Sequence, residues 1–220
     1  MNTGCQLNAV LNRTLRACFA VLVALLAGCS SFVDKPVRAT LYDFGPGPIT
    51  AQPAKQSTKA ALVLADIDAA GAMEGTVVLY RLGYADNHQL RPYAQARWSA
   101  PPPQLVRQRL REQLGRDRIV LNPVEGAALA RSGGSLPRAL RIELEEFSHY
   151  FESPSQSVGL LRLRATLLEN TAGGEKLLAQ RNVVVQRPAP SADASGGVRG
   201  LTAAVDAAAD ELVQWLAQIP

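Results

Sequence analysis

Two pairs of closely spaced carboxylates are the residues of this chain that most suggest chemistry. Asp66 and Asp68 stand two positions apart after an apolar run, and Glu143 and Glu145 stand two apart beside Arg141. Residues two apart in a strand project from one face, and paired carboxylates can bind a cation or divide the roles of acid and base. We favour a structural interpretation, in which the aspartates mark a strand running into a turn and the glutamates lie on a solvated strand face.

The histidines and the short motifs add no catalytic site. His88 and His149 lie in different segments, which argues against a shared metal site. The sequence lacks the Gly-x-Ser-x-Gly elbow of hydrolases, a phosphate-binding loop and a zinc-protease motif. We therefore predict no catalytic residue, no metal site and no enzymatic activity.

Cys29 stands at the end of an N-terminal apolar segment. Arg13 and Arg16 are the only charges in the first 33 residues, and an unbroken apolar run over residues 17–27 follows them. A basic start, an apolar centre of about 7–15 residues and small residues before a cut are typical of a secretory signal. A bilayer span needs about 20 apolar residues. The alternative, a buried helix or a short membrane anchor, leaves the ending Leu26-Ala27-Gly28-Cys29 unexplained.

That ending resembles a bacterial lipobox in its residue types, their order and their distance from the arginines. The resemblance implies cleavage between Gly28 and Cys29 and acyl chains, such as palmitate, that hold Cys29 on a membrane. Position 30 is a serine, whereas an aspartate directly after the cysteine retains such lipoproteins in the inner membrane. We therefore expect the protein to be held on the periplasmic face of the outer membrane. The predicted parts are a signal peptide over residues 1–28, a lipidated tether over 29–37 and one domain over 38–220.

The mature chain differs from the full one in charge and in cysteine content. Removal of residues 1–28 leaves 192 residues with 21 basic and 19 acidic side chains, so the formal charge falls from +4 to +2. Cys5 and Cys18 leave with the signal, which excludes a disulfide, a cysteine–zinc site and a cysteine nucleophile in the domain. The basic residues are spread along the chain without a block, and we predict no nucleic-acid partner.

The patterns in the mature chain predict a single α/β domain, with a mixed sheet that includes an antiparallel meander and two main flanking helices. The expected strands cover residues 38–44, 60–67, 76–82, 89–98, 118–121, 140–151, 161–167 and 176–186, and the expected helices cover 101–114 and 198–219. The strand–helix–strand order from 89 to 121 is compatible with a right-handed parallel crossover. Residues 122–137 and 188–197 are expected to be loops.

Two groups of residues are candidates for contact with a partner. The first combines aromatic side chains with an arginine, namely Tyr80, Tyr93, Arg97 and Trp98. Such residues dominate interface hot spots, although we favour the alternative of core aromatics with an arginine stacked on them. Strand alternation places Tyr93 and Arg97 on one face and Trp98 on the other. The second group is the hairpin tip at Pro154 and Gln156, because a protruding loop on a rigid scaffold suits docking.

The middle of the chain carries residues that resemble a known family. They are Tyr80-Arg81, the run Leu90-Arg91-Pro92-Tyr93-Ala94, Arg97-Trp98, Pro101-Pro102 and Leu105, with Tyr42 in the first strand. This pattern is similar to that of the ABC-type transport auxiliary lipoproteins, which include the paraquat-inducible protein C group. The resemblance covers about Val37 to Gln218, and it implies a mixed sheet flanked by helices.

The resemblance also implies a non-enzymatic outer-membrane lipoprotein that serves an envelope-spanning lipid transport system. Its partners would be an inner-membrane permease or ABC transporter, a periplasmic protein with mammalian-cell-entry (MCE) domains, and outer-membrane lipid. Its role would be to dock that conduit to the outer membrane. No cofactor besides the lipid on Cys29 is implied, and a homo-oligomer is compatible with the role. The alternatives are a structural lipoprotein that binds another assembly or the cell wall, and a tethered periplasmic hydrolase that works through carboxylates.

Overall fold

The computed structural model describes residues 38–47, 59–132, 136–171 and 173–220. Residues 39–220 form one compact unit. The predicted signal peptide, the cleavage site at Gly28, the lipidation site Cys29 and the tether all lie outside the described residues. No helix of the described chain is both long enough and apolar enough to cross a membrane.

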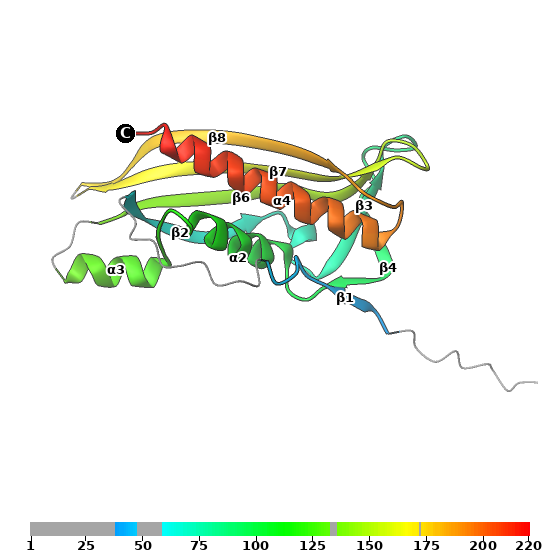
Figure 1. Ribbon diagram of the computed structural model, residues 1–220, viewed down its shortest axis with the longest axis horizontal. Helices are drawn as coiled ribbons and strands as arrows, with labels where there is room; N and C mark the ends of the chain where they lie inside the picture. Colours follow the sequence, from blue (N-terminus) through cyan, green and yellow to red (C-terminus); the bar gives the residue numbers. More distant parts are fainter. Residues whose placement is uncertain (1–37, 48–58, 133–135, 172) are drawn as a thin grey trace, which may run out of the picture. The chain divides into compact units, whose positions relative to one another are not determined.

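A mixed sheet is the centre of this unit (Figure 1). Within the described ranges it has eight strands: β1 (Thr40–Tyr42), β2 (Lys59–Ala69), β3 (Val77–Leu82), β4 (Arg91–Trp98), β5 (Arg118–Leu121), β6 (Arg138–Phe151), β7 (Ser157–Thr171) and β8 (Gly174–Pro188). The strand order is β1-β4-β3-β6-β2-β5, with β7 on the other side of β6 and β8 beyond β7.

Strand β6 holds the sheet together because it is long enough to pair with three other strands. One of its edges pairs with β7 in an antiparallel ladder that runs from Ala139 to Phe151. Its other edge pairs in parallel with β2 over residues 138–144 and then with β3 over residues 149–151. Strands β6, β7 and β8 form the predicted antiparallel meander, since alternating apolar residues favour half-buried strands and short turns join them.

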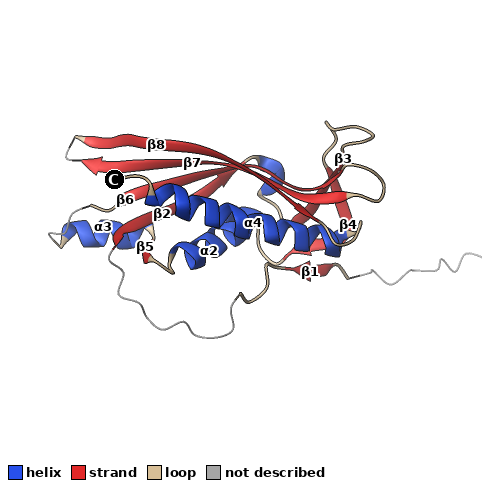
Figure 2. Cartoon of the chain, turned by 45° about the horizontal axis from the view of Figure 1, so that its top comes forward, coloured by secondary structure: helices blue, strands red, loops and turns tan. Residues whose placement is uncertain are grey.

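Two helices, α2 (Pro102–Leu114) and α4 (Ala194–Ala217), cover one face of the sheet (Figure 2). The first turn of α2 accepts prolines because its N–H groups have no partner inside the helix. Helix α4 buries Leu201, Val205 and Leu212 completely against the sheet, as their three- and four-residue spacing predicts. Leucines and isoleucines of β2, β6 and β7 complete this core. The chain is therefore a single α/β domain with a mixed sheet.

A third helix, α3 (Pro123–Arg131), occupies part of the segment that we expected to be a loop. Asn122 accepts a hydrogen bond from the Glu125 backbone N–H (2.8 Å), and the Glu125 carboxylate accepts one from the Asn122 N–H (2.7 Å). This capping box explains why so short a segment is helical. Gly126 of α3 packs on Val63, which points away from the main core, so α3 lies on the face opposite α2 and α4.

The expected parallel crossover from β4 to β5 is wrong. Strand β4 is antiparallel to β3, whereas β3, β6, β2 and β5 are all parallel to one another. Strands β2 and β5 are parallel neighbours in the sheet, and the chain between them runs through β3, β4 and finally α2. Helix α4 also begins four residues earlier than expected, because the Asp193 carboxylate accepts a hydrogen bond from the Gly196 N–H (2.7 Å) and caps the helix.

Candidate functional site

An aromatic cluster with one imidazole lies where β3, β4 and β6 meet. The rings of Tyr80 and Tyr93 have centroids 4.6 Å apart, and those of His149 and Phe151 are 4.3 Å apart. Tyr80 contacts Phe151 edge-on at 6.1 Å, and the Tyr93 hydroxyl lies 2.8 Å from His149 Nδ1. Tyr80, Tyr93, His149 and Phe151, called the aromatic cluster below, thus connect three strands.

His149 is the buried polar centre of this cluster. Its side chain has no solvent-accessible surface, and burial lowers its pKa from 6.5 to about 4. Nδ1 shares a hydrogen bond with the Tyr93 hydroxyl, while Nε2 has no hydrogen-bond partner among the described residues. Burial also raises the pKa of the Tyr93 hydroxyl, and the nearby hydroxyl of Tyr80 adds to that effect. Both groups are therefore neutral at pH 7, and neither one is poised to exchange a proton there.

Our sequence analysis did not select His149. The sequence did contain a signal, because His149 lies midway between Phe147 and Phe151 at two-residue spacing, which places all three on the inward face of β6. Gly197 of α4 comes so close that a Cβ there would lie 2.5 Å from His149 Nδ1. The imidazole consequently fills the space beneath the first turns of α4.

Trp98 belongs to the main core instead. Its side chain is 1% exposed and packs edge-on against Phe44, with ring centroids 5.5 Å apart, and against Phe147 at the same distance. Strict alternation predicted opposite faces for Tyr93 and Trp98, yet both side chains pack on the main core. A register shift in the β3–β4 ladder between Val77 and Leu79 breaks the alternation.

Arg97 points its guanidinium back onto its own strand. It donates hydrogen bonds to the backbone carbonyls of Tyr93 (2.9 Å) and Ala96 (2.8 Å), and a longer one to that of Ala94 (3.2 Å). Residues 93–96 have no partner in β3, so the arginine supplies donors to carbonyls where the β3–β4 ladder is interrupted. This geometry gives Arg97 a structural role in the strand, and it does not stack on the aromatic cluster.

The hairpin tip lies at the same end of the sheet as the aromatic cluster. Pro154 and Gln156 are exposed, and the turn is closed by bonds from the backbone N–H groups of Glu152 (2.9 Å) and Ser153 (3.2 Å) to the Gln156 carbonyl. Phe151 opens this turn and belongs to the cluster. The structure thus brings the two tyrosines of the first candidate group near the hairpin tip, whereas Trp98 and Arg97 lie elsewhere.

The glutamate pair lies on the sheet face opposite α2 and α4. Glu143 and Glu145 form ion pairs with Arg164 at 3.2 and 2.5 Å, and Glu145 also pairs with Arg162 at 3.0 Å. Arg141, beside them, pairs with Glu175. Alternating charges at these spacings make a solvated strand face, as predicted.

The aspartate pair lies in the last four residues of β2, which ends at Ala69, two residues later than expected, and runs into the 3-10 turn Gly71–Met73. Asp66 and Asp68 are both exposed, and Asp66 is paired with Arg107 at 3.3 Å beside an open groove of about 690 Å³. Within the described ranges, no three histidine, cysteine or acidic residues lie close enough to hold a metal ion.

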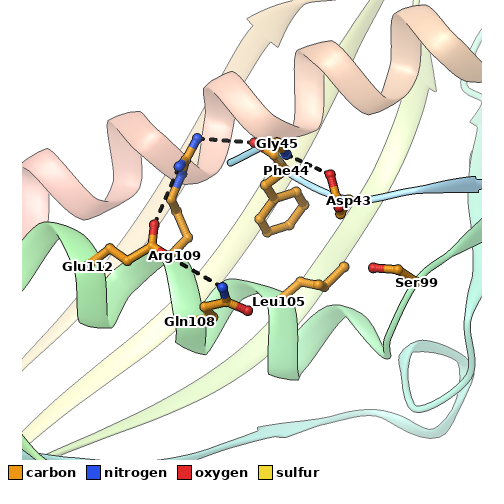
Figure 3. A pocket seen from close by; sticks show the side chains of 8 residues that line it. All are labelled: Asp43, Phe44, Gly45, Ser99, Leu105, Gln108, Arg109 and Glu112. Atoms are coloured by element: carbon orange, nitrogen blue, oxygen red, sulfur yellow. Dashed lines mark hydrogen bonds and ion pairs between the residues drawn. The ribbon is translucent and has the colours of Figure 1, made fainter. Parts of the chain in front are cut away.

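A small pocket of about 110 Å³ lies between α2 and the turn after β1 (Figure 3). Arg109 dominates it: Nε bonds to Asp206 of α4 (2.7 Å), Nη2 donates to the Phe44 carbonyl (3.2 Å) and Nη1 lies 3.5 Å from Glu112. The guanidinium thus directs Nε and Nη2 to groups of the protein itself, and Nη1 lies next to a carboxylate. Arg109 therefore joins α2, α4 and the segment after β1.

Comparison with known proteins agrees with this architecture. The model of the ABC-type transport auxiliary lipoprotein component family matches residues 42–213. A crystal structure of a Xanthomonas campestris protein of family DUF330 is similar over 80% of this chain and 94% of that one, with 20% identity and a TM-score of 0.62. An uncharacterized protein is similar over 81% of this chain and 99% of that one, with 15% identity and a TM-score of 0.59.

No curated protein matches the chain. At such low identity the two solved structures support the fold alone, and the function rests on the family model. That model spans almost the whole described domain, from the last residue of β1 into α4. The chain therefore belongs to the family of ABC-type transport auxiliary lipoprotein components.

Proposed function

We propose that this protein is a non-enzymatic outer-membrane lipoprotein that docks the periplasmic conduit of an MCE-type lipid transport system to the outer membrane. The observation that carries the proposal is the family match over residues 42–213. The lipobox-like ending at Cys29 supports an anchor, and the proposed protein needs no cofactor other than the lipid on that residue. An inner-membrane permease or ABC transporter would complete the system.

The hairpin tip is the surface that suits docking best. Pro154 and Gln156 are exposed, and the closed turn and the aromatic cluster below it hold the tip in one shape. A preformed loop loses little conformational entropy when it binds. Tyr80 and Tyr93 would act through this rigid base, because they are only partly exposed.

The anchor is tested by Cys29→Ala, with Cys18→Ala as the matched control in the part of the chain that cleavage removes. Acyl chains contribute about 0.8 kcal/mol per buried methylene, so their loss should move the protein from the membrane to the soluble periplasmic fraction. The control should stay in the outer-membrane fraction on a sucrose gradient. A Cys29→Ala protein that remains there would refute the lipid anchor.

Docking is tested by co-purification with the periplasmic MCE-domain protein. The double variant Pro154→Asp and Gln156→Arg should reduce the recovered MCE protein at least about tenfold, since few residues carry most of an interface's energy. Val124→Arg, a change at a side chain that is 74% exposed on α3, should leave recovery unchanged. Equal recovery with both variants would exclude the tip, and no recovery with the wild-type protein would exclude the docking role.

A further inference from the structure

Strand β8 presents a long edge that no described strand covers. It has 15 residues and pairs only with β7 among the strands of the described chain. In both ribbon views it is the outermost strand of the meander (Figures 1 and 2). The strands at the ends of the main strand order, β1 and β5, have three and four residues. Natural sheets usually keep exposed edges short, because unpaired N–H and C=O groups bind further strands.

The register of the β7–β8 ladder identifies the groups on this edge. Ala189 N–H donates to the Ser157 carbonyl (2.9 Å), one position beyond the Val158–Pro188 pair. Hydrogen-bonded and non-hydrogen-bonded pairs alternate in an antiparallel ladder. Counting back in steps of two, the residues that direct N–H and C=O groups away from β7 are Gln180, Asn182, Val184 and Gln186.

Two details agree with this assignment. The Gln186 carbonyl accepts a hydrogen bond from the side chain of Arg187 (3.0 Å), which a carbonyl inside the β7–β8 ladder would not need. Pro188 is the next position that faces the edge, and proline has no N–H to offer there. The row of backbone N–H and C=O groups that can pair with another strand therefore ends at Gln186.

We propose that this edge binds a second copy of the chain, with the two β8 strands antiparallel about a two-fold axis at Val183. In this register Gln180 lies opposite Gln186 of the second copy and Asn182 lies opposite its Val184. Each of these four residues then donates one backbone hydrogen bond and accepts one. The centred register keeps Pro188, which has no N–H to donate, outside the four hydrogen-bonded pairs, whereas a shift by two residues toward it would place Pro188 opposite Gln180.

The side chains along the edge are compatible with this self-pairing. The four edge-facing residues are uncharged, and their side chains lie on the open face of the sheet. On the other face, Arg181 is already paired with Glu211 of α4 (2.8 Å) and would lie opposite Val185 of the second copy. Arg187 would lie opposite Ala179. No like charges face each other, which favours a second copy of this chain as the occupant.

Two double variants that differ at one position test the pairing. Asn182→Lys with Val184→Lys places a lysine opposite a lysine at both central pairs, whereas Asn182→Lys with Val184→Asp places a lysine opposite an aspartate. Both side chains are exposed, Val184 at 59%, so both variants should fold. Sedimentation velocity of the full mature chain in detergent should show a dimer for the wild type and for the Lys/Asp variant. The Lys/Lys variant should have a dimer Kd at least about tenfold higher, so it should already be monomeric at concentrations where the other two are dimers.

Photocross-linking in intact membranes provides the second measurement. A benzoylphenylalanine at Gln180 should give a cross-linked dimer, and the same probe at Val124 on α3 should not. Equal association of the two charge variants, a monomeric wild type, or cross-links from Gln180 only to other proteins would each overturn the proposal. Because the pairing does not rest on the transport role, its failure would leave the docking proposal intact.

Discussion

Lowering the pH from 7 toward 4 is expected to destabilise the folded protein through the imidazole of His149. In the unfolded chain this group binds a proton near pH 6.5, whereas burial lowers its pKa in the native state to about 4. Between these values only the unfolded state binds the proton. The stability linked to neutral His149 is therefore fully present above about pH 6.5, and it is lost progressively as the pH decreases toward 4.

The magnitude follows from one proton. Each pH unit inside the window costs about 1.4 kcal/mol, so the whole window costs about 3 kcal/mol, a large part of a typical domain's stability. Asp193 does not mask the effect. Its own pKa is lowered from 3.8, chiefly by the Gly196 backbone N–H, so the stability it contributes is lost only below that window.

Urea unfolding at pH 7, 6 and 5 measures this slope in the wild type, in His149→Phe and in Tyr93→Phe. In His149→Phe the free energy of unfolding should change less steeply with pH than in the wild type, by about 1.4 kcal/mol per pH unit, because the titrating group is gone. Tyr93→Phe should be less stable by about 1 kcal/mol at every pH, through the lost hydrogen bond, and should keep the slope. Parallel curves for His149→Phe and the wild type would show that this imidazole does not titrate differently on folding, which would refute the reasoning.

Two further changes test the packing of α4 and α2. Gly159→Ala should cost about 1–3 kcal/mol or more in urea unfolding, since its Cβ would lie 2.2 Å from the Gly200 backbone of α4. Gly71→Ala, with nothing within 4 Å, is the control, and equal costs would contradict the close approach. Arg109→Ala should cost about 1–3 kcal/mol because it removes the part-buried bonds to Asp206 and to the Phe44 carbonyl, whereas Arg141→Ala, in an exposed pair, should cost less than about 1 kcal/mol. A lower Tm for Arg109→Ala than for Arg141→Ala would support the ranking, and a larger loss for Arg141→Ala would be inconsistent with it.

Most of the secondary structure could be predicted from local patterns. Leu140, Ile142 and Leu144 alternate with charged residues, and α4 repeats apolar residues at helical spacing, so β6 and α4 follow from periodicity. Helix α3 was missed although Asn122 and Glu125 form a capping box, because the segment up to Pro137, which contains Gly133-Gly134, was expected to be one loop. The start of α4 was missed for a similar reason, since Gly196 and Gly197 are weak helix formers.

The sequence by itself determined the half-buried strands, the two main helices, the solvated glutamate ladder and the family, because each of these depends on residue types at short spacing. Only the tertiary structure decided the rest. The register shift in the β3–β4 ladder turned Tyr93 and Trp98 to the same face, and the order of the strands made β4 antiparallel to β5. The burial of His149 beneath Gly197 and the free edge of β8 depend in the same way on segments far apart in the chain. Periodicity identifies which face of an element is apolar, whereas neighbours across a ladder are set by long-range pairing that no local pattern encodes.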